Sequence, residues 1–284
     1  MKPAPYIGIT GLGSLEEAKK ITNYLEKSKP FLLLNHLSLT PYIIMLGVTC
    51  SNKRLADPLS SGSTSPSLKD ATKIFRSMPL NCLRMVHYFT ENENKLTEEI
   101  VQLFQQPLPI NLTLLGDAPL SNLSAHYLSS SSGLQINQSW PNPEILRTIV
   151  ASIPDLQITL QLPKQILDQP IIDIVKKASN YADICQYLLI DPSGGQGQDL
   201  DLNYCSELLL ALDEALPKTT IGVAGGFGAE NVAERIKEIH AKVKRPFCID
   251  AQGKLRTNNK LDVDKVKLYL ANAFEAWAKV ITSS

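Results

Sequence analysis

Short apolar segments, each followed by a stretch of helical character, recur in eight cycles along this chain of 284 residues. Apolar runs of this kind are typical of strands buried on both faces of a parallel sheet. Strands that alternate with amphipathic helices predict such a sheet with its helices packed over it. An open doubly wound sheet uses the same units, but no G-x-G-x-x-G motif follows the first strand. Eight cycles close a barrel. We therefore predict a single (β/α)8 TIM-barrel domain over residues 1–284.

The expected elements follow from the same pattern. Strands are predicted at Pro5–Thr10, Tyr42–Val48, Cys82–Tyr88, Gly133–Asn137, Leu156–Leu162, Tyr187–Ile190, Thr220–Val223 and Phe247–Asp250. Ser14 and Glu17 predict a capping box at the start of the first helix. Two segments interrupt the cycles: a polar loop at 52–67, of a kind that is often functional or mobile, and residues 107–132 between strands three and four. We interpret 107–132 as an insertion, a hairpin or a lid.

Composition restricts the classes of function. The 28 basic and 28 acidic residues balance, which leaves no electrostatic footprint for nucleic acid or an anionic membrane. The five cysteines form no C-x-x-C pair, so they predict neither a metal site nor a disulfide framework. No signal peptide or membrane span is apparent, and no cofactor motif stands out. We expect a cytoplasmic protein without a cofactor or metal, and the oligomeric state stays open.

The sixth predicted strand ends at a carboxylate. Asp191 follows Tyr187–Ile190 and leads into a loop that contains Gly194, Gly195 and Gly197. Barrel enzymes hold their chemistry at the carboxyl ends of the strands, so Asp191 is a candidate catalytic residue. The alternative interpretation is that Asp191 caps or turns the loop, as aspartate often does.

Glycines after the seventh and eighth strands predict a phosphate site. Gly225 and Gly226 follow strand seven, and Gly253 follows strand eight. These two loops commonly bind phosphate in a barrel, because glycine lets backbone N–H groups approach an anion and the next helix adds a positive dipole end. The alternative is a tight turn between strand and helix. The expected ligand is a phosphorylated small molecule.

Several motifs resemble the phosphoribosylanthranilate isomerases of tryptophan biosynthesis. Y-L-L-I-D-P-S-G-G-Q-G-Q-D-L-D resembles their L-L-L-D-S…G-G-T-G-x-x-F-D-W, and V-A-G-G-F-G-A-E-N-V resembles their L-A-G-G-L-x-P-E-N-V. L-Q-I-N-Q, I-D-A-Q-G-K-L-R and G-L-G-S-L-E-E-A are similar to further family segments. The resemblance is specific from about Gln135 onward. It implies a barrel that performs an Amadori rearrangement, with Asp191 as the general acid and Gly225 and Gly226 in the phosphate turn.

The chain also departs from the family pattern. The resemblance puts Thr10 at the position of the family's general base, a cysteine, and Gly8 at the position of a lysine two residues earlier. Asn137 stands where the family has a histidine on strand four. A threonine hydroxyl is no base near neutral pH without an activator of its own. Cys50, at the exit of strand two, is a candidate substitute base, although a buried apolar role is the alternative.

His87 and Glu91, near the end of strand three, are further candidates for the base. Two hypotheses follow. The chain is either an isomerase of a phosphorylated sugar derivative, with Asp191 as acid, or a diverged, non-catalytic barrel that binds a phosphorylated metabolite or a protein partner. The retained Asp191 and glycine loops favour the first, and the missing cysteine favours the second.

Overall fold

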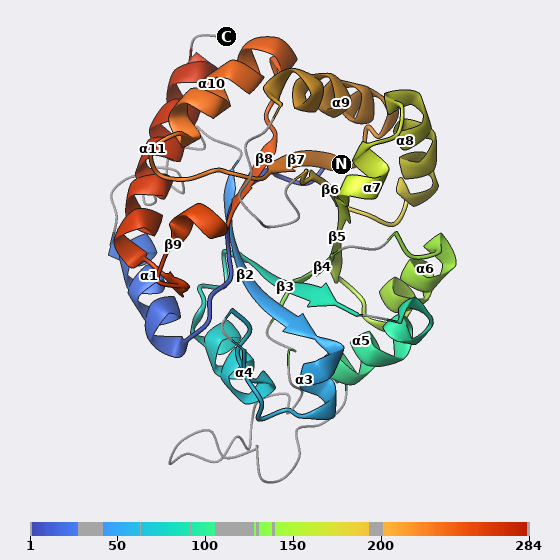
Figure 1. Cartoon of the computed structure of the whole chain (residues 1–284), viewed down its shortest axis with the longest axis vertical. Coiled ribbons are helices and arrows are strands. Elements are labelled where there is room, and N and C mark those ends of the chain that lie inside the picture. The colour runs from blue at the N-terminus through green and yellow to red at the C-terminus, as the bar shows by residue number, and fades with distance from the viewer. Residues whose placement is uncertain are drawn as a thin grey trace.

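The computed structural model describes residues 2–27, 42–62, 64–90, 92–105, 128, 131–137, 140–192 and 201–282. Its centre is a closed barrel of parallel strands in sequence order, in which β8 pairs with β1 (Figure 1). The strands are β1 Tyr6–Thr10, β2 Ile43–Ser51, β3 Leu83–Phe89, β4 Gly133–Ile136, β5 Gln157–Leu162, β6 Tyr187–Ile190, β7 Thr220–Ala224 and β8 Cys248–Ala251. The predicted (β/α)8 barrel is confirmed.

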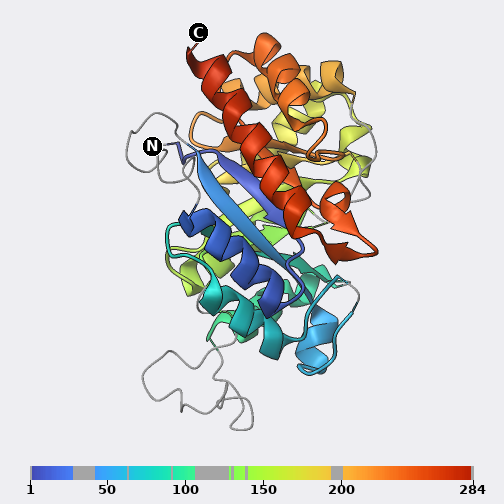
Figure 2. The same cartoon turned by 90° about the vertical axis from the view of Figure 1, so that its left-hand side faces the viewer.

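Helices form a ring around the strands (Figure 1). They are α1 Leu15–Lys27, α3 Asn52–Ala56, α4 Leu68–Ser77, α5 Leu96–Gln105, α6 Pro143–Ser152, α7 Lys164–Leu167, α8 Ile171–Ala178, α9 Leu202–Ala215, α10 Val232–Val243 and α11 Val263–Thr282. The long α11 packs between α10 and α1 and so covers the junction of β8 with β1 (Figure 2). None of the helices in these ranges is both long enough and apolar enough to span a membrane.

The structure differs from the sequence expectations at short elements. The segment expected as a polar loop, 52–67, begins with the helix α3, and the unexpected α7 precedes α8. Beyond β8 the chain forms a 3-10 turn, Gly253–Leu255, and a two-stranded hairpin, β9 Arg256–Thr257 with β10 Lys260–Leu261. Elements of two to five residues are too short to produce a period in the sequence. The proposed insertion at 107–132 lies almost wholly outside the described residues.

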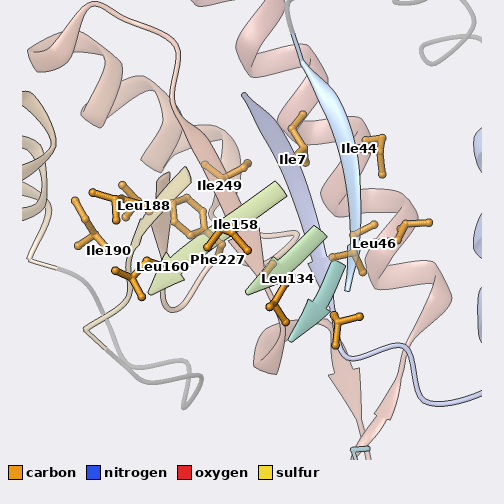
Figure 3. Close-up of a cluster of buried hydrophobic side chains, with 14 of the residues drawn as sticks. Ile7, Ile44, Leu46, Leu134, Ile158, Leu160, Leu188, Ile190, Phe227 and Ile249 are labelled. Carbon is orange, nitrogen blue, oxygen red and sulfur yellow. The ribbon is translucent and has the colours of Figure 1, made fainter. Parts of the chain in front are cut away.

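Side chains alternate between the two faces of each strand and form two apolar layers. Outward side chains pack under the helices in the main core, which includes Ile7, Phe227 and Ile249 (Figure 3). Inward side chains fill the amino-terminal half of the barrel. This inner cluster consists of Tyr6, Met45, Leu83, Met85, Tyr187 and Cys248, and all of them are buried. The lower part of the barrel interior is therefore packed mainly with apolar side chains, and the acidic and imidazole side chains of the interior lie in the level above.

Candidate active site

A layer of buried polar side chains lies inside the barrel at the carboxyl ends of the strands. No member of this polar layer is more than 6% exposed. It comprises Thr10 of β1, His87 of β3, Gln135 of β4, Gln161 of β5, Asp191 directly after β6, and Asp250 of β8. Because a buried polar group is costly unless it is hydrogen-bonded, such a layer has to be internally paired.

One half of the layer is centred on Thr10. Its hydroxyl oxygen lies 2.9 and 3.0 Å from the two carboxylate oxygens of Asp250, to which it donates, and 3.2 Å from Nε2 of His87. We call these three residues the Thr10 cluster. The sequence expectation that Thr10 lies at the mouth of the barrel is consistent with this geometry. The acidic group beside Thr10 is Asp250, a carboxylate in addition to the predicted Asp191.

The other half is a chain of amides that ends on Asp191. Gln135 Nε2 donates to Gln161 Oε1 at 3.3 Å and to Asn137 Oδ1 at 3.0 Å, and Gln161 Nε2 donates to Asp191 Oδ2 at 2.8 Å. Side chains at the ends of β4 and β5 thus orient the Asp191 carboxylate after β6. The Oε1 atom of Gln135 is buried and has no hydrogen-bond partner among the described residues, so it is available to a donor on a bound molecule.

The two carboxylates lie at the same height in the barrel. Ile190 is in register with Val223, and the next residue of β7, Ala224, is in register with Asp250. Asp191 follows Ile190, so it sits beside Ala224, two strands away from Asp250. Adjacent strands are about 4.8 Å apart, which puts the two backbones roughly 10 Å from each other. At that spacing the two carboxyl groups are near enough for Asp191 to raise the pKa of Asp250.

Burial shifts the protonation of the Thr10 cluster. The pKa of Asp250 is raised to about 7, chiefly by burial and in part by the nearby Asp191, whereas the hydrogen bond from Thr10 opposes the rise. Burial lowers the pKa of His87 to about 3, so its imidazole is neutral at physiological pH. Asp250 is therefore a carboxyl group that exchanges its proton near neutrality, as a general base or acid should.

Cys50 lies on the opposite face of its strand. Thr49 is in register with the inward-facing His87, so the next residue, Cys50, faces outward and belongs to the core under the helices. Burial raises the pKa of its thiol to about 12. The geometry favours the alternative interpretation of Cys50, a small buried apolar residue, because a base would have to reach the barrel interior as a thiolate.

The turn after β7 has the backbone shape expected of a glycine loop. Gly225 and Gly226 adopt φ angles of 97° and 66°, which side chains disfavour. Asn231 braces the turn, since its side chain accepts from the N–H of Gly228 at 2.9 Å and donates to the carbonyl of Gly226 at 2.9 Å. A β-carbon added at Gly228 would lie 2.8 Å from Cβ of Lys254, so this turn contacts the loop after β8.

That second loop carries the other predicted phosphate ligand. Gly253 is exposed and opens the 3-10 turn Gly253–Leu255. The two glycine loops therefore meet at one end of the barrel, as the sequence analysis expected of a phosphate site. The substrate-loop glycines Gly194, Gly195 and Gly197, as well as Glu91, lie outside the described residues.

Sequence reasoning missed Asp250, the second carboxylate of the polar layer. Asp250 ends the eighth predicted strand just as Asp191 follows the sixth, and in a closed barrel the eighth strand neighbours the first. An aspartate at the end of a buried strand, found twice, was the signal from which Asp250 could have been predicted. The roles of Gln135 and Gln161 had no comparable signal, because a lone glutamine in a strand resembles any surface residue. In the ranges that the structure covers, no three His, Cys, Asp or Glu side chains are grouped to hold a metal ion.

The barrel and its two acidic strand ends define a TIM-barrel protein with two buried carboxyl groups at the carboxyl face. Comparison with known proteins is more specific. The family described as N-(5'-phosphoribosyl)anthranilate (PRA) isomerase matches residues 153–272. N-(5'-phosphoribosyl)anthranilate isomerases from Bacillus cereus and Bacillus anthracis are 26% identical to this chain over 196 and 198 residues, which is 66% of this chain and 85% of theirs.

Solved structures agree. Phosphoribosyl anthranilate isomerase from Thermotoga maritima superposes with a TM-score of 0.58 at 19% identity, over 95% of this chain and 98% of the other. The enzyme from Pyrococcus furiosus gives 0.57 at 15% identity, over 95% and 99%. At this identity the structures establish the fold alone. The sequence matches show that the chain is similar to phosphoribosylanthranilate isomerases, most specifically over residues 153–272.

Proposed function

We propose that this protein isomerises a phosphorylated aminoaldose to the corresponding aminoketose, with Asp191 as the general acid and Asp250 as the general base. The observation that carries the proposal is the pair of buried carboxylates at one level of the barrel mouth. Two carboxylates close enough to repel each other favour a state in which the pair holds a single proton. The active form in this proposal is the one in which that proton is on Asp191 and Asp250 is ionised.

The proton movements follow from those two roles. Asp191 gives its proton to the ring oxygen as the carbon–oxygen bond breaks and the nitrogen lone pair forms a C=N bond. Asp250 then takes the proton from the adjacent carbon, and the electrons of that C–H bond form the C=C bond of an enolamine while the C=N pair returns to nitrogen. Tautomerisation of the enolamine gives the ketone. Thr10 takes no proton in this scheme, which fits the weak basicity of a hydroxyl.

The phosphate of the substrate would bind at the two glycine loops. The turn at Gly225 and Gly226 and the loop at Gly253 present backbone at the same end of the barrel, and α10 begins at Val232 directly after the first turn. Backbone N–H groups and a helix amino terminus both favour an anion. The half-buried Asn137 and the unpaired Oε1 of Gln135 would face the rest of the substrate.

Binding without catalysis is the second candidate. Gly8 and Thr10 occupy the positions at which the family resemblance puts a lysine and a cysteine, so two groups of the family pattern are absent from β1. A diverged barrel that binds a phosphorylated metabolite would keep the glycine loops without keeping the chemistry.

Kinetics with phosphoribosylanthranilate and complementation of a strain that lacks the isomerase separate the two candidates. We expect the wild-type chain to complement, and we expect Asp191→Asn to lower kcat by about 100- to 10,000-fold, the usual contribution of a general acid. Asp155→Asn is the matched control, because Asp155 is exposed next to the amino end of β5, with a φ of 65° that asparagine also tolerates. Equal turnover in both variants would exclude Asp191 as the acid, and failure to complement together with tight phosphate binding would favour the second candidate.

A further inference from the structure

The hydrogen atoms of the Thr10 cluster can be assigned by counting donors. A threonine hydroxyl has one hydrogen to donate and lone pairs to accept with, and an ionised carboxylate can only accept. Thr10 therefore has to direct its hydrogen to Asp250, whose two oxygens lie 2.9 and 3.0 Å away. The remaining neighbour, Nε2 of His87 at 3.2 Å, must then be the donor to the Thr10 oxygen. This requires neutral His87 to carry its proton on Nε2.

Two glycines make space for these contacts. A β-carbon at position 47 would lie 2.5 Å from Nε2 of His87 and 2.9 Å from Oγ1 of Thr10, so any side chain there would part the two groups. A β-carbon at Gly8 would lie 2.7 Å from Oδ1 of Asp250. Neither glycine has a positive φ, so backbone conformation does not explain them. Their absent side chains instead allow the cluster to close.

The surroundings make Asp250 the group of the cluster that titrates. Around it lie Tyr6 of β1, Cys248 of β8, Tyr269 of α11 and Asp191 after β6. Burial raises the pKa of both tyrosines and of the thiol, so these three stay neutral at physiological pH. The Asp191 carboxylate is then the neighbouring group whose charge, when it is ionised, raises the pKa of Asp250. His87 is neutral as well, so it influences Asp250 through hydrogen-bond direction and not through a charge.

We infer that His87 is a positioning residue that donates Nε2–H to Thr10 and thereby holds the Thr10 hydroxyl against the Asp250 carboxylate. The relay of donors runs from His87 through Thr10 to Asp250 and stabilises the ionised form that accepts the substrate proton. Thr10 thus serves the base from the position at which the family resemblance puts the base itself. This inference rests on the proposed function for the role of Asp250, although the relay is testable without any substrate.

The tautomer of His87 is the direct test. Nitrogen-15 NMR of the ligand-free wild-type protein distinguishes a protonated Nε2 from a protonated Nδ1. We expect Nε2–H at pH 8 to 9, where Asp250 is ionised. Protonation on Nδ1 would overturn the inference, because Nε2 would then accept from Thr10 and compete with Asp250 for its single hydrogen. This measurement needs no variant and therefore does not depend on the folding of one.

The pKa of Asp250, followed through its carboxyl carbon-13 shift, tests whether Thr10 and His87 both act on Asp250. Thr10→Val removes the hydroxyl in an equal volume, and we expect it to raise the pKa of Asp250 by roughly one unit, since a hydrogen bond to the charged form is lost. His87→Phe should raise it by a smaller amount, and His87→Gln, which keeps an N–H donor, should bring it back toward the wild-type value. An unchanged or lowered pKa in His87→Phe would contradict the relay.

Catalysis provides the second readout and separates the two proposals. We expect the lower limb of the kcat pH profile to move upward with the pKa of Asp250 in Thr10→Val and His87→Phe, while KM changes less than twofold. If the pKa shifts occur and no isomerase activity is found, the relay stands and the proposed function fails. If wild type is active and the profile of His87→Phe does not move, the relay fails and the proposed function stands.

Discussion

Threonine at position 10 gives the proposed site a different arrangement of proton donor and base from the one that the family resemblance implies. Its hydroxyl is a weak base, but it is a good donor to the carboxylate beside it. Asp250 in turn has a pKa near 7 because it is buried, which is the value that suits proton transfer at neutral pH. One donor and one desolvated carboxylate can therefore replace a thiol, and the chemistry at this level depends on burial and not on residue type alone.

The raised pKa of Asp250 has a consequence for stability. The unfolded carboxyl group loses its proton near pH 4, whereas the native one keeps it up to about pH 7. Between these values the native state binds more protons than the unfolded state, so stability falls as pH rises through that window. Three units at about 1.4 kcal/mol each set an upper limit of about 4 kcal/mol.

We therefore expect Asp250→Asn to stabilise the protein relative to wild type at pH 8 and to do so far less at pH 4. Urea unfolding at both pH values measures the difference. Asp155→Asn, at an exposed site, should show no such dependence. A pH-independent gain from Asp250→Asn would mean that the native carboxyl group is ionised at its ordinary pKa.

Among the elements, the strand ends and the turns that follow them carry the site. Strand alternation sends Thr10 and His87 inward while their neighbours Ile9 and Tyr88 enter the outer core. The capping box predicted at the start of α1 is confirmed: Glu17 N donates to Ser14 Oγ, and Glu17 accepts from the N–H groups of Gly13 and Ser14. The turn after β7 is similarly closed on itself by Asn231.

The β7 turn supports a prediction about anion binding. At a φ of 66° an alanine at position 226 would cost about 1–2 kcal/mol, and the turn would relax away from the shape that presents its N–H groups. We expect Gly226→Ala to weaken binding of inorganic phosphate by roughly tenfold in calorimetric titrations. Gly13→Ala is the control, since its β-carbon would meet its nearest neighbour at an ordinary 3.6 Å. Equal affinity in the two variants would move the phosphate site elsewhere.

At the scale of the whole molecule, closure of the ring depends on the carboxyl-terminal helix. Trp277 of α11 is fully buried. Its ring centroid lies 4.5 Å from that of Tyr42 and 4.7 Å from that of Phe247. Those two residues directly precede β2 and β8. One side chain thus connects the last helix to the residues that lead into β2 and β8.

We expect Trp277→Ala to lower the free energy of unfolding by about 3–5 kcal/mol, the usual cost of emptying a large buried site. Leu268→Ala, on the same helix but 52% exposed, should cost far less. Urea unfolding followed by circular dichroism measures both. A loss confined to α11, with the barrel still folded at low urea, would show that the helix is not part of one cooperative unit.

The repeating pattern of apolar strand and amphipathic helix is a local property, so the sequence determined the barrel, its strand order and the placement of Asp191, Gly225 and Gly226 at one end. Periodicity also located β6 at its observed bounds. Short elements such as α3 and the β9–β10 hairpin were not predicted, because they are too short for a period to repeat.

Only the tertiary structure decided which strand ends meet inside the barrel and which face away. Register and strand alternation bring Asp250, Thr10 and His87 together from β8, β1 and β3 and direct Cys50 into the outer core. Burial then raised the pKa of Asp250 and lowered that of His87. Desolvation depends on what surrounds a side chain in space, and a linear sequence does not contain that information.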